Sequence, residues 1–251
     1  MPGSDAIAAG DLNIQAWVTA VTSYNPGSNV DLQFQDSGKA TGPAGNSNGN
    51  NEGYTFDIVS LGRNGSITLA FDQPIANGGG FDFAVFENSF ADGFLELAWV
   101  EVSSNGIDFI RFDGYSLTPG PVGPFSATMD ATNLNGLAGK YRGGWGTPFD
   151  LELVKDSPNL DVNAITHLRL VDIVGDGLEL DSLAAPIGPN PIYDPYPTSG
   201  SAGFDLDAVA ILNQAQPAIE QNVPIPNFLL LILAVMLGAI ARVRMISSTG
   251  K

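Results

Sequence analysis

The acidic side chains of this sequence are the residues whose types and spacing most clearly suggest chemistry. Asp205 and Asp207 are two positions apart in the β-prone run 204–212, so on an extended strand both carboxylates project from one face, about 7 Å apart. Carboxylates at that spacing repel each other unless a cation or water separates them. Oxygen ligands from a strand and a loop suit Ca²⁺. We therefore predict a Ca²⁺ site with these candidate ligands: Asp82, Asp176, Asp181, Asp205 and Asp207.

Further acids lie close to these candidates in the sequence, namely Glu87 with Asn88, Glu179, and Asp194. None of them follows the spaced pattern of an EF-hand loop. The alternative interpretation is that all these acids are turn-forming or strand-edge groups in water.

Aromatic residues in the Gly- and Pro-rich segments suggest a second kind of site. Trp145, Tyr193 and Tyr196, with Tyr141 nearby, are candidate glycan-binding residues, because an exposed ring offers an apolar face and a polar edge to a sugar. The alternative is that these rings close the ends of the domain.

The sequence gives no pattern of catalytic residues. There is no cysteine, which excludes thiolate nucleophiles and Cys-ligated zinc, and there is no Gly-x-Ser-x-Gly motif. The single histidine, His167, alternates with Arg169 and is interpreted as structural. We expect no enzyme; the alternative is a carbohydrate-binding module or a carbohydrate-active enzyme, since paired carboxylates serve glycoside hydrolysis.

Charge separates the chain into two parts. The 251 residues carry 10 Lys and Arg against 27 Asp and Glu. Residues 223–251 contain three of the basic groups and no acid, which leaves a net charge of −20 on residues 1–222. So acidic a surface repels phosphate backbones and excludes nucleic acid as a partner.

Short alternating runs indicate an all-β domain over residues 1–212. The expected strands are 54–61, 66–71, 81–87, 94–103, 108–112, 164–174 and 204–212. Their spacing is typical of a sandwich or barrel, and Asn64-Gly65 and Asn105-Gly106 are expected turns. Residues 36–53 read as a flexible loop, 113–163 and 175–203 as long loops, and 213–222 as a linker.

The C-terminal segment 223–251 reads as a membrane-directed tail containing a hydrophobic helix. Val223, Pro224 and Pro226 precede the apolar run 228–241, and Arg242 and Arg244 follow it. A spanning helix needs about 20 apolar residues, and flanking arginines predict a cytoplasmic C-terminus with the domain outside. The alternative is a buried core helix. Residues 1–10 lack the features of a signal peptide, so we expect the natural start to lie upstream.

Two resemblances follow from these segments. The tail is similar to the PEP-CTERM class of bacterial sorting signals, although Ile225 stands where the type motif has glutamate. The resemblance implies that an exosortase-type enzyme processes the tail. The alternative is a plain single-pass membrane anchor. Segments 59–90, 96–112, 137–151, 165–176 and 192–212 resemble an uncharacterised family of bacterial cell-surface proteins, which implies a jelly-roll-like antiparallel β-sandwich and an envelope location.

We therefore expect an exported cell-surface or extracellular-matrix protein with a non-enzymatic binding or structural role. Its expected partners are the membrane, the processing enzyme, and polysaccharide or a second copy of itself.

Overall fold

Antiparallel strands build the domain, as the short alternating runs predict. A computed structural model describes residues 4–45 and 55–216, and all but the last of these lie in one compact unit, Met1–Ala215. Every pairing between the strands named below is antiparallel, which confirms the all-β class. The tail 223–251, residues 217–222 of the expected linker and residues 46–53 of the expected flexible loop lie outside the described residues.

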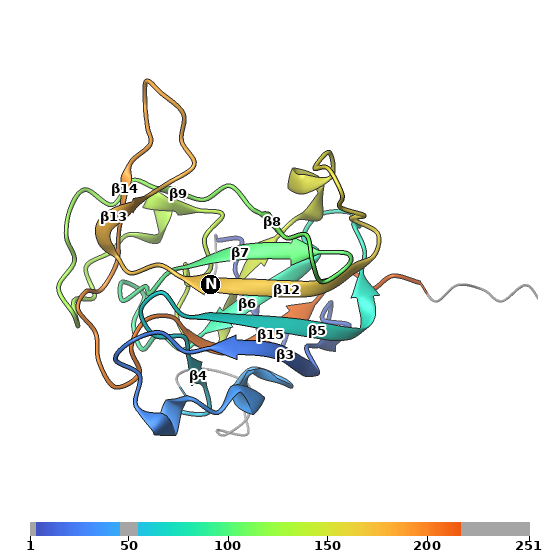
Figure 1. Ribbon diagram of the computed structural model, residues 1–251, viewed down its shortest axis with the longest axis horizontal. Helices are drawn as coiled ribbons and strands as arrows, with labels where there is room; N and C mark the ends of the chain where they lie inside the picture. The colour runs from blue at the N-terminus through green and yellow to red at the C-terminus, as the bar shows by residue number, and fades with distance from the viewer. Residues whose placement is uncertain (1–3, 46–54, 217–251) are drawn as a thin grey trace, which may run out of the picture. The chain divides into compact units, whose positions relative to one another are not determined.

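One sheet has five strands in the order β3–β5–β12–β7–β8. Their bounds are β3 (Ala20–Asn25), β5 (Ser66–Ile75), β7 (Ala98–Ser103), β8 (Ile110–Arg111) and β12 (Ile165–Asp172). Figure 1 shows β7, β12, β5 and β3 side by side. The prediction that segment 164–174 is a central strand is confirmed, because β12 pairs with β5 on one side and β7 on the other.

The other large sheet has the order β1–β11–β6–β15–β2, with β4 also paired to β15. Its strands are β1 (Ile7–Ala8), β2 (Ala16–Trp17), β4 (Val59–Ser60), β6 (Phe83–Glu87), β11 (Trp145–Phe149) and β15 (Asp205–Ile211). Strand β15 has partners on both edges, and every one of its residues is buried.

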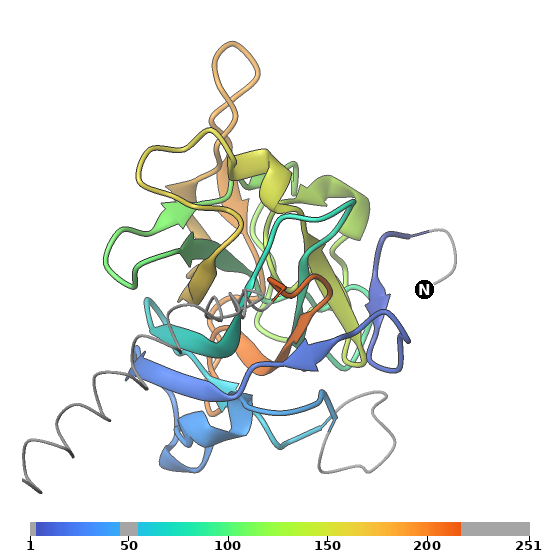
Figure 2. The same cartoon turned by 90° about the vertical axis from the view of Figure 1, so that its right-hand side faces the viewer.

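The prediction that 113–163 and 175–203 are loops is wrong in part: these segments contain β11 of the large sheet, two small sheets, and the 3₁₀ helices η4 (Ala131–Asn133) and η5 (Leu151–Val154). β9 (Tyr115–Ser116) pairs with β10 (Leu134–Asn135), and β13 (Asp176–Leu180) pairs with β14 (Pro191–Tyr193). Two further 3₁₀ helices, η1 (Leu32–Phe34) and η2 (Ser37–Ala40), lie nearer the N-terminus. Figure 2 shows the β13–β14 connection projecting from the unit. Within 4–45 and 55–216, no helix has the length and apolarity to cross a membrane.

The two large sheets contribute side chains to a common core. Ile67 and Leu69, which alternate in the sequence, are fully buried in it beside residues of β6 and β15. At its centre the Phe83 ring stacks on Phe149, with 5.2 Å between ring centroids, and meets Phe112 edge-on at 5.9 Å. This apolar burial, worth about 25 cal/mol per Å² removed from water, is the main favourable contribution to folding.

Several element boundaries differ from the predictions. The predicted strand 66–71 continues past Pro74 to Ile75 in β5, because an irregularity in the β5–β12 register tolerates the missing N–H of the proline. The predicted strands 54–61 and 94–103 shorten to β4 and β7. Leu134–Asn135, within the predicted loop 113–163, form β10 instead.

Candidate functional site

Asp82, one of the predicted Ca²⁺ ligands, holds two loops by their backbone amides. Its fully buried carboxylate accepts hydrogen bonds from Gly78 N and Leu151 N, both at 2.7 Å, and from Asn213 Nδ2 at 2.9 Å. Its oxygens are thus used to join β6 to the turns around it. Burial raises the pKa of Asp82, and the three donors act against that rise.

Asp181 and Asp176 also bind backbone amides. The Asp181 carboxylate accepts from Asn190 N at 2.8 Å, Leu183 N at 3.1 Å and Ser116 N at 3.2 Å, which ties the β13–β14 connection to β9. Burial acts to raise the pKa of Asp181, but these hydrogen bonds outweigh it and the pKa is lowered. Asp176 accepts from Leu178 N at 2.9 Å, two residues along β13.

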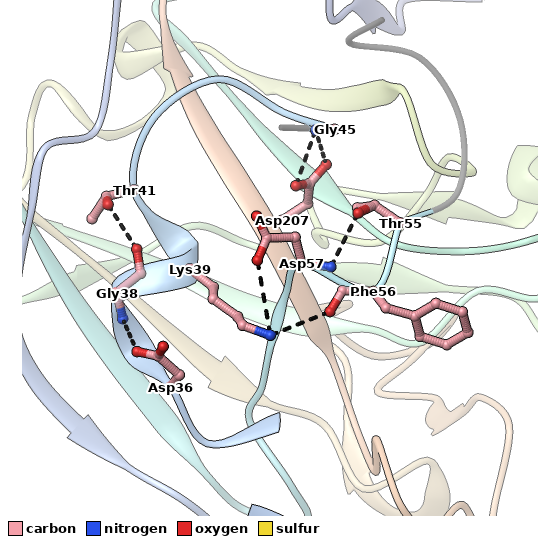
Figure 3. A network of polar contacts seen from close by, with 9 residues as sticks. All are labelled: Asp36, Gly38, Lys39, Thr41, Gly45, Thr55, Phe56, Asp57 and Asp207. Atoms are coloured by element: carbon pink, nitrogen blue, oxygen red, sulfur yellow. Dashed lines mark hydrogen bonds and ion pairs between the residues drawn. The ribbon is translucent and has the colours of Figure 1, made fainter. Parts of the chain in front are cut away.

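Asp207 occupies a β-bulge in β15. Leu206 pairs with Glu87 and Ala208 with Phe86, so Asp207 is the extra residue of the bulged strand. Its carboxylate accepts from Gly45 N, at 2.9 and 3.1 Å to the two oxygens, as Figure 3 shows. Burial raises the pKa of Asp207 to about 7. The side chain that the sequence placed in a metal site therefore anchors the segment after η2.

Asp205 belongs to a different group, which we call the carboxyl cluster: Glu87, Glu96, Asp172, Asp194 and Asp205. Each of the five is at most 5% exposed. Burial raises the pKa of Asp205 to about 7 and those of Glu87 and Glu96 well above the usual range, and the negative charge of Asp205 adds to the rise at both glutamates. No ion pair formed by the described residues includes a member of this cluster.

Asp172 and Asp194 of the carboxyl cluster accept hydrogen bonds from the backbone of other segments. Asp172, at the end of β12, accepts from Phe204 N at 2.8 Å and Asn64 N at 3.0 Å. Asp194 accepts from Leu97 N at 2.9 Å. Burial raises the pKa of Asp172 to about 8 and that of Asp194 well above its usual value, and the negative charge of Asp172 adds to the rise at Asp194.

A cavity of about 100 Å³ opens beside three members of the cluster. Its lining includes the carboxyls of Glu87, Glu96 and Asp205, and the hydroxyls of Thr198 and Ser201. The Asp205 carboxyl accepts a hydrogen bond from the Ser60 hydroxyl. This cavity is the candidate functional site, because it brings buried acids from β6, β15 and the segment before β7 to one accessible point.

The structure does not bring the five predicted Ca²⁺ ligands together. Asp82 precedes β6, whereas Asp205 lies beside Glu87 at its other end. Within the described ranges, no group of three or more acidic or histidine side chains is placed to hold a metal ion. Ca²⁺ binding stays a prediction.

The predicted glycan-binding aromatics lie on different sheets. Trp145 begins β11 and is half-buried beside β1, whereas Tyr193 ends β14 and packs against a separate buried cluster. Arg63 covers the ring of Tyr196, 5.0 Å from its centroid. Tyr141 is buried and donates to Asp5. The role of these four rings in glycan binding stays a prediction.

His167 lies within β12, between β5 and β7. Its Nδ1 is 2.9 Å from Thr166 Oγ1, and its ring packs against Gly106 in the β7–β8 turn, where a Cβ would come within 2.9 Å of it. These contacts agree with the interpretation of His167 as a structural residue.

Sequence reasoning missed Glu96, although a signal for it was present. Glu96 falls in register with Ala98, Val100 and Val102, which face the core, and Glu87 falls in register with Phe83 and Val85. An acid on the apolar side of an alternating run indicates a buried carboxyl.

No protein-family model matches the chain, and the search of curated proteins gives no match either.

Proposed function

We propose that this chain is an exported cell-surface or extracellular-matrix protein whose all-β domain has a binding or structural role and no catalytic one. In this proposal a PEP-CTERM-like tail, residues 223–251, directs the chain to the membrane for processing by an exosortase-type enzyme. The observation that carries it is the contrast between an acidic domain and an uncharged apolar run, 228–241, that ends in Arg242 and Arg244.

Two features of the described domain support this proposal. The two large sheets share one core, which suits the jelly-roll-like sandwich of the cell-surface family that the sequence resembles. Buried aspartates also fasten loops to the sheets through backbone amides, as Asp82 and Asp181 do. Such anchoring holds long loops in a chain that has no cysteine to form disulfides.

Deleting residues 223–251 is the test of the proposed location. Expressed in a bacterium with an exosortase and given a signal peptide, the full chain is expected in the envelope fraction and the truncated chain in the soluble secreted fraction. The reason is that transfer of the run 228–241 into lipid is favourable by about 0.3–0.6 kcal/mol for each large aliphatic residue. A matched full-length variant replaces Leu230 and Ala234 with arginine. It is expected to fractionate like the truncated chain, because charges within the run oppose its transfer into lipid. Equal fractionation of all three chains contradicts the proposal.

A further inference from the structure

Three buried carboxyls form the floor of the candidate cavity, and no lysine or arginine of the described residues pairs with them. Glu87, Glu96 and Asp205 are 1%, 3% and 5% exposed, respectively, and all three line the cavity. Carboxylates removed from water are stable only with hydrogen-bond donors, a positive charge or a bound proton. The described residues supply hydroxyl and amide donors here, but no lysine or arginine within ion-pair distance.

One oxygen on this floor makes no hydrogen bond within the part of the chain that the structure describes. Glu96 Oε1 is buried and makes no hydrogen bond with any described residue. By contrast, Glu87 accepts from Ser89 N at 2.8 Å, and Asp205 accepts from the Ser60 hydroxyl. A buried acceptor left unpaired destabilises the folded state, and more so when it is charged. The Glu96 oxygen therefore points to a donor that enters the cavity from outside.

The wall and mouth of the cavity are aromatic. Phe94 is buried, and its ring centroid lies 4.5 Å from that of Phe90. Phe90 and Phe125 line the same cavity and are 51% and 69% exposed. Phenylalanine rings attract a cation held within about 6 Å of the ring and also pack against aliphatic carbon.

We propose that this cavity binds the protonated amine of an aliphatic ligand, with its N–H donors directed at the carboxylates and its adjoining methylene groups against the phenylalanine rings. An ammonium group has three donors, which matches acceptors spread over three side chains better than a metal ion does, because no acidic trio among the described residues is close enough to hold a metal. The volume of about 100 Å³ has room for a few waters or one small head group. The inference rests on the binding role proposed above and is independent of the tail.

Binding is tested on the full chain, kept in solution by a non-ionic detergent at pH 7.5, by calorimetric titration with n-butylammonium chloride. The parallel probes are n-butanol, which has the same apolar chain without the charge, and CaCl₂. We expect saturable binding of n-butylammonium, and much weaker binding of n-butanol. Glu96→Gln is expected to weaken amine binding by about tenfold or more, because it removes a charged acceptor.

Two further variants separate loss of the site from loss of the fold. Phe125→Ala changes an exposed ring and is expected to weaken amine binding several-fold without altering the melting temperature. Glu152→Gln, an exposed glutamate paired with Lys155, is the matched control and leaves binding unchanged.

Three results overturn the inference: equal binding of n-butanol and n-butylammonium, unchanged amine binding in Glu96→Gln, or binding of CaCl₂ alone. None of these arms involves residues 223–251, so their failure is distinguishable from a failure of the proposed location.

Discussion

The unfolding free energy of the domain is expected to fall as the pH rises from about 4 to about 8. Burial raises the pKa of Asp205 and Asp207 from 3.8 to about 7, and that of Asp172 to about 8. Between the ordinary value and the raised value, the folded state holds a proton that the unfolded state has lost. Each such carboxyl then lowers the unfolding free energy by about 1.4 kcal/mol per pH unit.

The sign follows from which state binds the proton. A carboxyl whose pKa is raised on folding contributes its full stabilisation below the unfolded value, and this contribution disappears as the pH passes the folded value. Asp181 has a lowered pKa and acts in the opposite direction, but only near and below 3.8, where the unfolded form titrates. The net change between pH 5 and pH 8 is therefore a loss of stability.

Urea unfolding followed by tryptophan fluorescence, at constant ionic strength, measures this change. Asp207→Asn keeps an oxygen acceptor for Gly45 N while removing one titrating group, so its stability is expected to fall less steeply with pH than that of the unaltered protein. Asp92→Asn, at a mostly exposed carboxylate beside Arg142, is the control and keeps the original slope. A stability that is constant or increasing between pH 5 and pH 8 contradicts the account of the buried carboxyls.

Asp82→Ala is expected to destabilise the domain by about 3 kcal/mol or more. The substitution leaves the amides of Gly78 and Leu151 and the side chain of Asn213 without their acceptor in a buried location. For a domain of this size, that loss corresponds to a fall of about 6–12 °C in the melting temperature. Differential scanning calorimetry measures it.

The matched control for Asp82→Ala is Asp130→Ala. Asp130 also accepts a backbone hydrogen bond, from Thr132 N at 2.9 Å, but it caps an exposed 3₁₀ turn where water replaces the lost acceptor. A much smaller change in melting temperature is expected there. If the two variants melt alike, the Asp82 carboxylate does not hold the loops in the way that its contacts indicate.

The strands were predictable where alternation and burial agree. Ile67 and Leu69 alternate with polar residues, and β5 forms there; the doubly apolar run at 164–174 becomes the central strand β12. The small sheets were not predictable, because β9 and β13 are paired through contacts distant in sequence. The composition of segments 113–163 and 175–203, rich in glycine and proline, predicts turns but does not predict which strands pair.

The candidate site was predicted only in part. Asp205 was named, but period-2 spacing grouped it with Asp207, and no local signal shows that a bulge gives the two different partners. Asp82 was named for its type, whereas its role depends on amides of Gly78 and Leu151 that only the folded chain brings to it. The sequence does show that Glu96 falls on the apolar side of an alternating run, and this pattern predicts a buried carboxyl.

The most direct test of the carboxyl cluster is the titration of its side-chain carboxyl carbons by ¹³C NMR in the absence of amines. Burial without a cationic partner predicts a midpoint at about pH 7 for Asp205 and one well above the ordinary 4.5 for Glu96. Midpoints at the ordinary values of 3.8 and 4.5 would show that water or a bound cation reaches these groups, and would contradict the claim that they are buried without a cationic partner.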